Sequence, residues 1–551
     1  MPHETIADQL LARAGDDHPG LLTRDRSWTW GEVVEESAAR AARARELRTA
    51  GPFHIGVLLD NEPEYVFWLG AAALAGATVV GINPTRRGAE LEREVRHTDC
   101  QMIVTDRAGA ALLDGLDIGV EADRFLVVDA PGYADRLARH DREPVPDPDV
   151  TATTRMLLLL TSGTTGASKA AICSQGRLAA LGATNSAKYD ISRDDICYCP
   201  MPLFHGNALM ALWAPALSAG ATIALTRKFS ASGFLPDVTY FGATYFTYVG
   251  KAIGYILARP EAPGDADNRL THGFGTEASP EDAARFLDRF GCRLVEGYGS
   301  SEGAGMLKRV PDAPTGALGR PARDGVRIVH PVNRTTCPPA VLDSYGRVRN
   351  PEEAIGEIVD TEGAARFEGY YNNEAANAER VRHGWYWTGD LGYVDEAGYF
   401  YFAGRSGDWI RVDGENISAL LTERVLRRHP GVIAAGVFGV PDPRSGDQVM
   451  AAVEIADGTR FEDLDLPGFL SRQEDLGTKG APRFVRVSHA LPTTASGKLR
   501  KKEMQLDGWR TGDPVHRWTG RGGPAYRPMT DEEKAALRGE FQANGRARFL
   551  P

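Results

Sequence analysis

The sequence predicts a layered α/β fold for the larger part of this 551-residue chain, followed by a β-rich stretch and a smaller α+β part. Three observations predict this fold class. Up to about residue 300, short apolar runs typical of buried strands alternate with segments of helical periodicity. From about Gly316, short strands separated by Gly, Pro and Asp indicate a β-rich subdomain. After Arg405, a smaller α+β pattern begins.

The individual elements follow from periodicity, apolar runs and capping residues. Residues 30–45 are expected to form an amphipathic helix, and the short apolar runs at 55–59, 102–105 and 156–160 are expected to be strands. The other expected elements are strands over 222–225, 244–249, 355–360, 398–403, 432–440, 449–455 and 484–487, a helix over 280–290 capped by Ser279, and a helix over 419–428. The Arg-, Gly- and Pro-rich tail from Thr511 is expected either to wrap the surface or to be disordered.

One uncharged span, residues 65–82, bears on whether the chain enters a membrane. It is barely long enough to cross a bilayer, and Gly70, Gly76 and Gly81 dilute its hydrophobicity. A buried helix ending near Gly76, followed by a strand over 77–82, fits better. Residues 1–20 contain no apolar signal core. We therefore expect a cytoplasmic protein without a membrane span, with peripheral association left open.

The composition limits the classes of function. With 42% hydrophobic residues, the chain can bury a large core and should hold more than one domain. A net charge of -11 without a long basic block argues against a nucleic-acid surface. The six cysteines are scattered, and Cys197 and Cys199 form a C-x-C rather than the paired motifs of a zinc site. Free thiols in a reducing compartment are the better interpretation.

The most informative segment runs from Thr161 to Lys169, directly after the expected strand 156–160. Its small and hydroxylated residues expose successive backbone N–H groups and hydroxyls, which can cradle phosphate oxygens, and Lys169 adds a positive charge. The spacing differs from that of a Walker A loop, because Gly163 and Gly166 are three residues apart. The segment therefore predicts a phosphate loop of another class. Its expected contacts are Thr161, Ser162, Gly163, Thr164, Thr165, Gly166 and Lys169.

Four later segments carry further polar residues that could act on a nucleotide. They are E-G-Y-G-S-S-E at 296–302, W-T-G-D at 387–390, G-R-S-G-D at 404–408 and P-T-T-A-S-G-K at 492–498. Taken alone, each fits an ordinary turn or strand end. In this order after the phosphate loop, they resemble the motifs of the adenylate-forming superfamily, which comprises acyl-CoA synthetases, firefly-type luciferases and peptide-synthetase adenylation domains. The R-S-G-D form is closest to the branch of fatty-acid transport proteins and very-long-chain acyl-CoA synthetases.

The resemblance implies a role for each motif. The ring of Tyr298 stacks on adenine, the hydroxyl of Ser301 bonds the α-phosphate, and the carboxylate of Glu302 holds Mg²⁺. Asp390 accepts hydrogen bonds from the ribose hydroxyls, and Arg405 is a second ribose or phosphate contact. Ser301 stands where the family usually has Thr, which keeps the hydroxyl.

The resemblance also implies where the acyl group and the thiol bind. Lys498 completes the adenylation site, and His205 of the P-L-F-H segment gates or lines the acyl pocket. Gly407 stands at the hinge where many acyl-CoA synthetases have Asp or Lys. Further nucleotide contacts are expected at Gly275, Thr276, Glu277, Gly299 and Ser300, the acyl pocket at His205, Asn207, Met210, Tyr248 and Gly250, and the thiol or hinge face at Gly407, Gly414, Glu415 and Asn416.

Two domains follow from the same resemblance: residues 1–406 bind ATP and the acyl group, and residues 407–551 form a mobile domain that carries Lys498. The implied reaction joins a carboxylic acid to ATP, giving acyl-AMP and pyrophosphate, after which the thiol of CoA forms the thioester. The small domain rotates between these steps. We therefore predict a Mg²⁺-dependent acid–CoA ligase for a medium-chain, long-chain or bulky apolar acid, either a monomer or a homodimer.

Other functions stay open at this point. The chain could adenylate an acid and pass it to a carrier-protein pantetheine or a separate enzyme. Gly407, which replaces the Asp or Lys of many acyl-CoA synthetases, is compatible with this alternative. A non-catalytic nucleotide- or acyl-binding protein is a second alternative. Against it, Glu302, Asp390, Arg405 and Lys498 are all retained. A luciferase-like oxygenase is compatible with the fold, but the fold does not argue for it.

Overall fold

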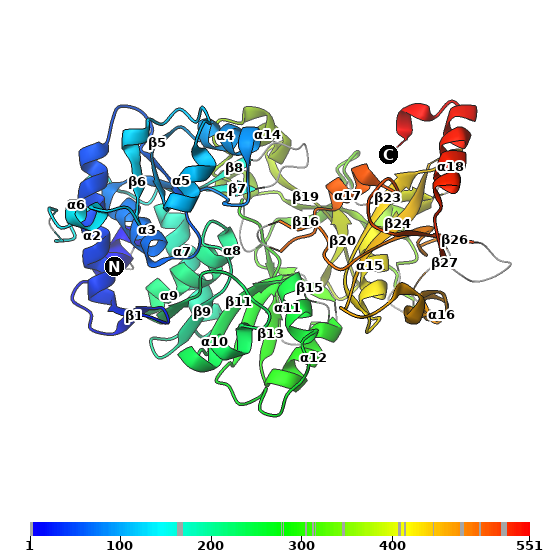
Figure 1. The fold of residues 1–551 in the computed structure, drawn as a ribbon, viewed down its shortest axis with the longest axis horizontal. Coiled ribbons are helices and arrows are strands. Elements are labelled where there is room, and N and C mark those ends of the chain that lie inside the picture. Colours follow the sequence, from blue (N-terminus) through cyan, green and yellow to red (C-terminus); the bar gives the residue numbers. More distant parts are fainter. Residues whose placement is uncertain are drawn as a thin grey trace.

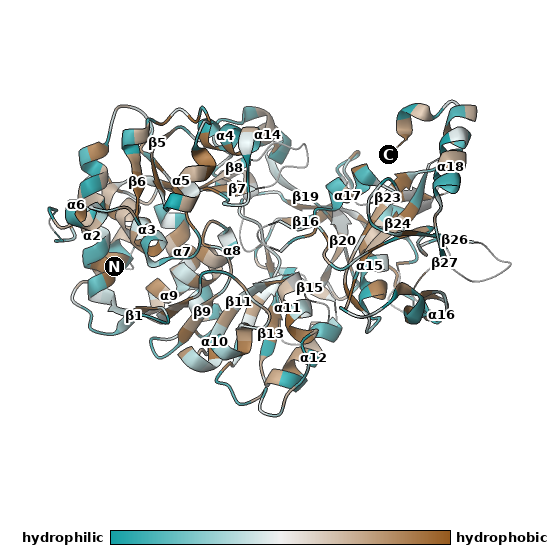
Figure 2. Ribbon diagram, viewed as in Figure 1, coloured by the Kyte–Doolittle hydropathy of each residue, from teal (hydrophilic) through white to brown (hydrophobic). Residues whose placement is uncertain are grey.

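A computed structural model describes residues 4–550 except residues 141, 162–168, 277, 279, 303–305, 311–312, 315, 344–347, 406–408, 413–414, 445, 474–475, 477–478, 495–496 and 520–525. Two α/β sheets, a β-rich subdomain and a smaller C-terminal sheet make up the fold (Figure 1), as expected. Hydrophobic residues follow inner strands such as β5 (Cys100–Thr105) and β24 (Asp447–Ile455), whereas hydrophilic residues cover outer helices such as α18 (Asp531–Ala543) (Figure 2).

The first sheet has the strand order β6-β5-β3-β4-β7-β8. Its strand pairs are parallel except for β7 with β8, which run antiparallel. Parallel strands are covered on both faces, which explains their continuous apolar runs. The elements are β3 (His54–Leu58), β4 (Thr78–Gly81), β5, β6 (Phe125–Val127), β7 (Arg155–Thr161) and β8 (Lys169–Ser174), with helices α2 (Trp30–Leu47), α3 (Pro63–Ala75), α4 (Gly88–His97), α5 (Arg107–Leu113) and α6 (Tyr133–Leu137).

The uncharged span of residues 65–82 forms the buried helix α3 and the strand β4, as predicted. Every residue of α3 from Tyr65 to Ala75 is buried in the main core. Across the described ranges of the chain, no helix is long and apolar enough to cross a membrane.

The second sheet has the order β13-β12-β11-β9-β10-β1-β2 and is parallel except for the pair β1 and β2. Gly275 on β12 allows a close approach: a Cβ there would lie 2.4 Å from the carbonyl oxygen of Tyr248 and 2.5 Å from its ring. The strands are β1 (Pro19–Leu22), β2 (Ser27–Thr29), β9 (Ile196–Cys199), β10 (Thr222–Leu225), β11 (Tyr245–Val249), β12 (His272–Thr276) and β13 (Arg293–Glu296).

One helical segment of this part is a π-helix, which is wider than an α-helix. This π-helix, Leu209–Trp213, follows the short helix α8 (Gly206–Ala208). Its carbonyl oxygens at Met210 and Ala211 accept hydrogen bonds from Asn185 Nδ2 and the Tyr245 hydroxyl, both at 2.9 Å. The other helices are α1 (Ile6–Leu11), α7 (Gln175–Lys188), α9 (Ala214–Ala219), α10 (Phe234–Phe241), α11 (Gly250–Leu257) and α12 (Pro280–Phe290).

The β-rich subdomain is antiparallel, with the order β14-β15-β20-β19-β17-β16 and β18 paired to β19. It has its own small core around Ile358 and Tyr386. Its elements are β14 (Leu307–Lys308), β15 (Ala317–Pro321), β16 (Val326–Val329), α13 (Pro351–Ala354), β17 (Gly356–Asp360), α14 (Glu374–Arg380), β18 (Val381–Arg382), β19 (Trp385–Val394) and β20 (Phe400–Arg405).

The C-terminal part has the sheet order β23-β24-β25-β26-β27 and two cores of its own, one on each side of the sheet's central strands. Part of the tail is ordered, because Leu537 and Phe541 of α18 pack in the core that contains Trp509. The elements are β21 (Trp409–Val412), β22 (Glu415–Ser418), α15 (Ala419–Arg427), β23 (Val432–Pro441), β24, α16 (Leu466–Ser471), β25 (Phe484–Ser488), α17 (Lys501–Asp507), β26 (Val515–Trp518), β27 (Tyr526–Pro528) and α18.

Candidate active site

The predicted phosphate loop joins the two antiparallel strands at the edge of the first sheet. Thr161 at the end of β7 lies opposite Lys169 at the start of β8, and the Thr161 hydroxyl donates to the Lys169 carbonyl oxygen at 3.3 Å. The Lys169 side chain is only 9% exposed, and its Nζ lies 3.3 Å from Glu379 Oε2 and 5.2 Å from the centre of the Tyr370 ring. The loop residues Ser162, Gly163, Thr164, Thr165 and Gly166 lie outside the described residues.

The predicted metal carboxylate, Glu302, is held by a tyrosine whose backbone pairs with β8 of the first sheet. The Tyr370 hydroxyl donates to Glu302 Oε1 at 2.8 Å and accepts from Arg380 Nε at 3.1 Å. Burial and the Glu302 charge raise the pKa of Tyr370, so the phenol keeps its proton. Arg380 also donates through Nη1 to the carbonyl oxygens of Trp387 and Thr388.

Ser301 lies at the point where the second sheet meets the segment after β9. Arg177 of α7 donates through Nη2 to the Ser301 carbonyl oxygen at 2.8 Å. A Cβ added to Gly206 would lie 3.0 Å from Ser301 Oγ and 3.6 Å from Met210 Sδ. The predicted phosphate hydroxyl and the predicted acyl-pocket residue Met210 therefore flank the same glycine.

The two predicted ribose contacts lie on neighbouring strands. Asp390 of β19 is paired in register with Arg405 of β20, and the Tyr298 hydroxyl donates to Asp390 Oδ2 at 2.9 Å. Thr388 fixes the turn that precedes Asp390, since its hydroxyl donates to the Ile358 carbonyl at 2.7 Å and accepts from the Asp390 N–H at 3.1 Å. Burial and the Asp390 charge raise the pKa of Tyr298 well above its ordinary value.

The charge of Lys498 acts on the buried ring of His205, although the two residues are far apart in the chain. Burial and, to a smaller extent, the charges of Lys498 and Arg86 lower the pKa of His205 to about 4. His205 Nε2 is buried and has no hydrogen-bond partner in the described part of the chain. The turn that carries Lys498 is closed by its N–H, which donates to Thr494 Oγ1 at 3.1 Å.

The C-terminal part rests on helices of the second sheet in this arrangement. Arg427 Nη2 of α15 lies 2.7 Å from Asp282 Oδ2 of α12. Tyr255 of α11 is hydrogen-bonded to Glu454 of β24. These contacts hold the turn of Lys498 toward the N-terminal part of the site.

The predicted acyl-pocket residues surround the ends of β11 and the π-helix. Asn207 Nδ2 donates to the Tyr248 carbonyl at 3.4 Å, and the Tyr248 hydroxyl donates to Glu296 Oε1 at 2.6 Å. Gly250 begins α11 directly after β11. Glu296 also accepts from the Ala278 N–H at 3.2 Å, which ties the pocket to the segment after β12.

The comparison with protein-family models covers most of the chain. Residues 9–371 match the AMP-binding enzyme model, and residues 421–498 match the model of the AMP-binding enzyme C-terminal domain. The chain belongs to the AMP-binding enzyme family.

Curated relatives of this AMP-binding enzyme are similar over nearly their whole lengths. Steroid-22-oyl-CoA synthetase of Rhodococcus jostii is 65% identical over 551 residues, which is 100% of this chain and 99% of that protein. The medium/long-chain-fatty-acid–CoA ligase FadD17 of Mycobacterium tuberculosis is 44% identical over 515 residues, 93% of this chain and 98% of that protein. The predicted likeness to the fatty-acid transport protein branch stays a prediction.

Solved structures share the fold of this AMP-binding enzyme. The anthranilate CoA ligase AuaEII in complex with anthranoyl-AMP has a TM-score of 0.80 at 20% identity, over 92% of this chain and 97% of that chain. ATP-bound MatB from Rhodopseudomonas palustris has a TM-score of 0.77 at 22% identity, over 92% of this chain and 98% of that chain. Both similarities extend over the large and the small part of the fold.

The donor set of the AMP-binding enzyme fits Mg²⁺ held partly by a substrate. Across the described residues, no group of three or more His, Cys, Asp or Glu side chains could hold a metal ion. Mg²⁺ commonly uses one or two carboxylates and takes its other ligands from phosphates and water. Glu302, which accepts a hydrogen bond from the Tyr370 hydroxyl, can supply such a carboxylate.

The remaining predicted residues of the AMP-binding enzyme lie at the ends of β12 and β13, on β22, or outside the described residues. Gly275 and Thr276 end β12, and Gly299 and Ser300 follow β13, where Ser300 is hydrogen-bonded to Tyr386. Glu415 and Asn416 of β22 lie opposite Val412 and Arg411 of β21. Glu277, Gly407 and Gly414 lie outside the described residues.

Sequence analysis missed the side chains that support this site. Glu379 pairs with Lys169, and Tyr370 donates to Glu302. Arg380 donates to the Tyr370 hydroxyl, and Arg177 donates to the Ser301 carbonyl oxygen. None of these four stands in one of the recognised motifs. The only available signal was the sequence G-Y-Y before α14, which does not show where either tyrosine points.

Proposed function

We propose that this AMP-binding enzyme is an acid–CoA ligase for a bulky apolar carboxylic acid, with a steroid side-chain acid as the first candidate. The observation that carries the reaction is the electrostatic interaction of Lys498 with His205, whose neighbour Gly206 lies against Ser301. The substrate class is supported by the 65% identity with steroid-22-oyl-CoA synthetase over the whole chain.

In the first half-reaction, the substrate carboxylate attacks the α-phosphorus of ATP and pyrophosphate leaves. Both reactants are anionic, so the site must supply positive charge and hold the geometry. Lys498 bridges the carboxylate and the α-phosphate, and the Ser301 hydroxyl donates to the same phosphate. Lys169 and the loop from Thr161 hold the other phosphates, and Asp390 with Arg405 holds the ribose.

Mg²⁺ bound by Glu302 would neutralise phosphate charge in this step. The chain's own residues orient that carboxylate: Tyr370 donates to Glu302, and Arg380 donates to Tyr370. His205 stays neutral near pH 7 because its pKa is about 4, so its ring lines the acyl pocket without competing with Lys498 for the substrate carboxylate.

In the second half-reaction, the thiol of CoA attacks the acyl carbonyl and AMP leaves. We propose that residues 407–551 rotate about Gly407, so that Lys498 withdraws and the face with Gly414, Glu415 and Asn416 builds the thiol tunnel. We also place the enzyme in the cytoplasm. All six cysteines are free and buried in the structure, as expected in a reducing compartment.

Straight-chain acids are the second candidate substrates, on the strength of the 44% identity with a medium/long-chain-fatty-acid–CoA ligase. A deciding experiment measures pyrophosphate release with ATP and Mg²⁺, with and without CoA. The acids should include a steroid with a carboxylated side chain, fatty acids of graded length and an aryl acid.

Highest kcat/KM with the steroid acid, and formation of its CoA thioester, supports the proposal. Higher kcat/KM with a fatty acid moves the substrate class to straight chains. Pyrophosphate release without any thioester contradicts CoA as the acceptor and favours a carrier protein.

A further inference from the structure

Two adjacent residues at the end of α14, Glu379 and Arg380, have opposite charges and approach opposite charges of the nucleotide site. Glu379 pairs with Lys169, the cation expected to hold phosphates. Arg380 reaches Glu302, the carboxylate expected to hold Mg²⁺, through the Tyr370 hydroxyl. Glu379 is thus an anion at the position expected for an ATP phosphate. Arg380 is a cation near the position expected for Mg²⁺.

The ion pair between Glu379 and Lys169 is weak enough for a ligand to displace the Glu379 carboxylate. Its side chain is 64% exposed, whereas the Lys169 side chain is 9% exposed and rests on the Tyr370 ring. A solvated carboxylate in a single ion pair is held weakly. A polyphosphate with several charges would compete successfully for the same ammonium group.

Arg380, in contrast, is held by several hydrogen bonds and by close packing. Its guanidinium donates to the Tyr370 hydroxyl at 3.1 Å and to the carbonyl oxygens of Trp387 and Thr388. A Cβ on Gly389 would lie 2.7 Å from Arg380 Nη1, so the guanidinium is packed against the turn before Asp390. Arg380 therefore links the metal carboxylate to the ribose-binding turn.

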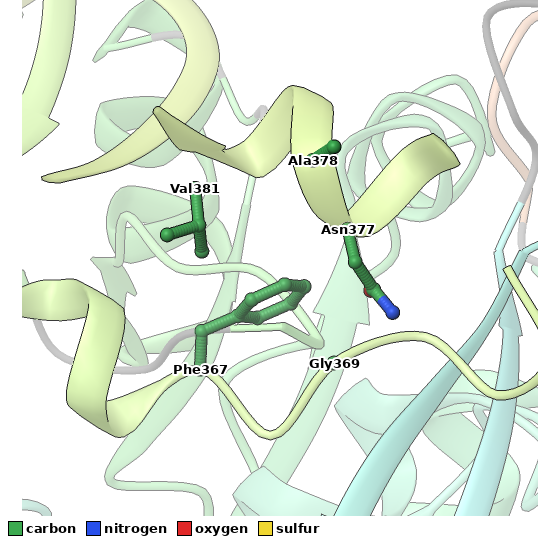
Figure 3. Close-up of a pocket in the computed structure, with 5 residues that line it drawn as sticks. All are labelled: Phe367, Gly369, Asn377, Ala378 and Val381. Atoms are coloured by element: carbon green, nitrogen blue, oxygen red, sulfur yellow. The ribbon is translucent and has the colours of Figure 1, made fainter. Parts of the chain in front are cut away.

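The helix that carries both residues is lightly anchored. Ala376 is the one residue of α14 that is buried. A surface pocket of about 380 Å³ lies between α14 and the segment before Tyr370, lined by Phe367, Gly369, Asn377, Ala378 and Val381 (Figure 3). Asn377 fastens the helix to Tyr370, accepting from its N–H at 2.6 Å and donating to its carbonyl at 3.1 Å. Displacement of Glu379 therefore requires little core to be broken.

We propose that Glu379 is a built-in competitor of the ATP phosphates for Lys169, and that Arg380 is a positioning residue that orients Glu302 through Tyr370. The inference rests on the proposed function only for the identity of the nucleotide. Glu379 pairs with the Lys169 ammonium, and binding of ATP exchanges this carboxylate for a phosphate. Arg380 keeps its contacts throughout.

The first test compares Glu379→Gln with Glu374→Gln, a matched variant in the first turn of the same helix. ATP binding is measured by calorimetry without any acid. Removing the competing charge should tighten ATP binding about two- to fivefold in Glu379→Gln. Glu374→Gln should leave it unchanged. Weaker binding in Glu379→Gln, or the same change in both variants, would overturn the competition.

The second test measures the Mg²⁺ concentration for half-maximal ATP binding in Arg380→Met, Arg380→Lys, Tyr370→Phe and the double variant Arg380→Met/Tyr370→Phe. If Arg380 acts through Tyr370, the double variant should need no more Mg²⁺ than the worse single variant. Arg380→Lys should recover part of the loss. Additive effects, or no change in Mg²⁺ requirement, would overturn the positioning role, and thermal unfolding checks that each variant is folded.

Turnover with the acids tests the proposed function, whereas ATP binding by Glu379→Gln tests the competition for Lys169, so either can fail without the other. If no acid in the substrate panel supports turnover but Glu379→Gln binds ATP more tightly, the function fails and the inference stands. If the ligase reaction is found and ATP binding is unchanged in Glu379→Gln, the inference fails and the function stands.

Discussion

At the scale of single residues, the charge of one group acts on a buried titratable group from a distant part of the chain. His205 follows β9 in the N-terminal part, and Lys498 lies in a tight turn after β25. Burial and, to a smaller extent, the charges of Lys498 and Arg86 lower the pKa of His205 and keep its ring neutral near pH 7. This arrangement suits a step in which two anions must meet.

Lys498→Ala should lower the rate of adenylation at least about 100-fold, because it removes the group that bridges the two anions. Thioester formation from supplied acyl-AMP should be nearly unchanged, since Lys498 is proposed to have withdrawn by then. Pyrophosphate release and thioester formation, measured separately, check this. Equal losses in the two partial reactions would show that Lys498 has another role.

His205→Gln should make the protein less sensitive to acid. The pKa of His205 is about 4 in the folded protein and 6.5 ordinarily, so the unfolded chain binds a proton that the folded chain rejects between these values. The free energy of unfolding therefore falls as the pH drops from about 6.5 toward about 4. Urea unfolding at pH 7 and pH 5 should show a smaller fall for His205→Gln, and equal falls for both proteins would contradict the low pKa.

At the scale of elements, close packing between strands places the groups that the motifs supply. The register of β19 with β20 sets Asp390 opposite Arg405, and the antiparallel pair β7 and β8 returns the chain so that Lys169 lies beside Thr161. On the second sheet, Gly275 of β12 lets the Tyr248 ring lie across the strand and reach Glu296. The contact of Tyr248 with Glu296 therefore depends on the absence of a side chain at Gly275.

Gly275→Ala should destabilise the protein by about 1–3 kcal/mol, because the new methyl group would overlap the Tyr248 backbone and ring. The KM for the acid should rise more than the KM for ATP, since Tyr248 is displaced. The control is Gly539→Ala on α18, where a Cβ meets no atom within 4 Å. Chemical unfolding and steady-state kinetics check both variants, and an unchanged stability of Gly275→Ala would contradict the packing argument.

At the scale of the whole molecule, the C-terminal part contacts the helices α11 and α12 of the N-terminal part (Figure 1). The contacts are polar: Arg427 pairs with Asp282, and Tyr255 bonds Glu454. Polar contacts of this kind can form and break without exposing a hydrophobic core. They suit the proposed rotation of this part of the chain between the two half-reactions.

Arg427→Glu should slow adenylation about two- to tenfold, because the new carboxylate repels Asp282 in the adenylation arrangement. Thioester formation from supplied acyl-AMP should be unchanged or faster. The double variant Arg427→Glu/Asp282→Arg should restore adenylation by re-forming the pair in reverse. A double variant no better than Arg427→Glu would show that the ion pair does not hold the domain.

Much of the fold could be predicted from local sequence. The strands over 222–225 and the helix over 280–290 have the expected bounds, and most other expected elements differ by one to three residues at an end. Periodicity and capping act between residues two to four positions apart, so a linear sequence records them directly. For the same reason the phosphate loop, the acidic and hydroxyl groups at 296–302 and Lys498 could be recognised as contiguous strings.

The support of the site could not be predicted, because it is made by residues far apart in the chain. Lys169 and Glu379 are 210 residues apart, and Tyr370 and Glu302 are 68 apart. A tyrosine or an arginine near a short helix does not reveal in the sequence which distant group it will contact. Strand order, strand register and the packing of the C-terminal part against α11 and α12 bring these groups together. Each of these depends on burial and packing summed over the whole chain.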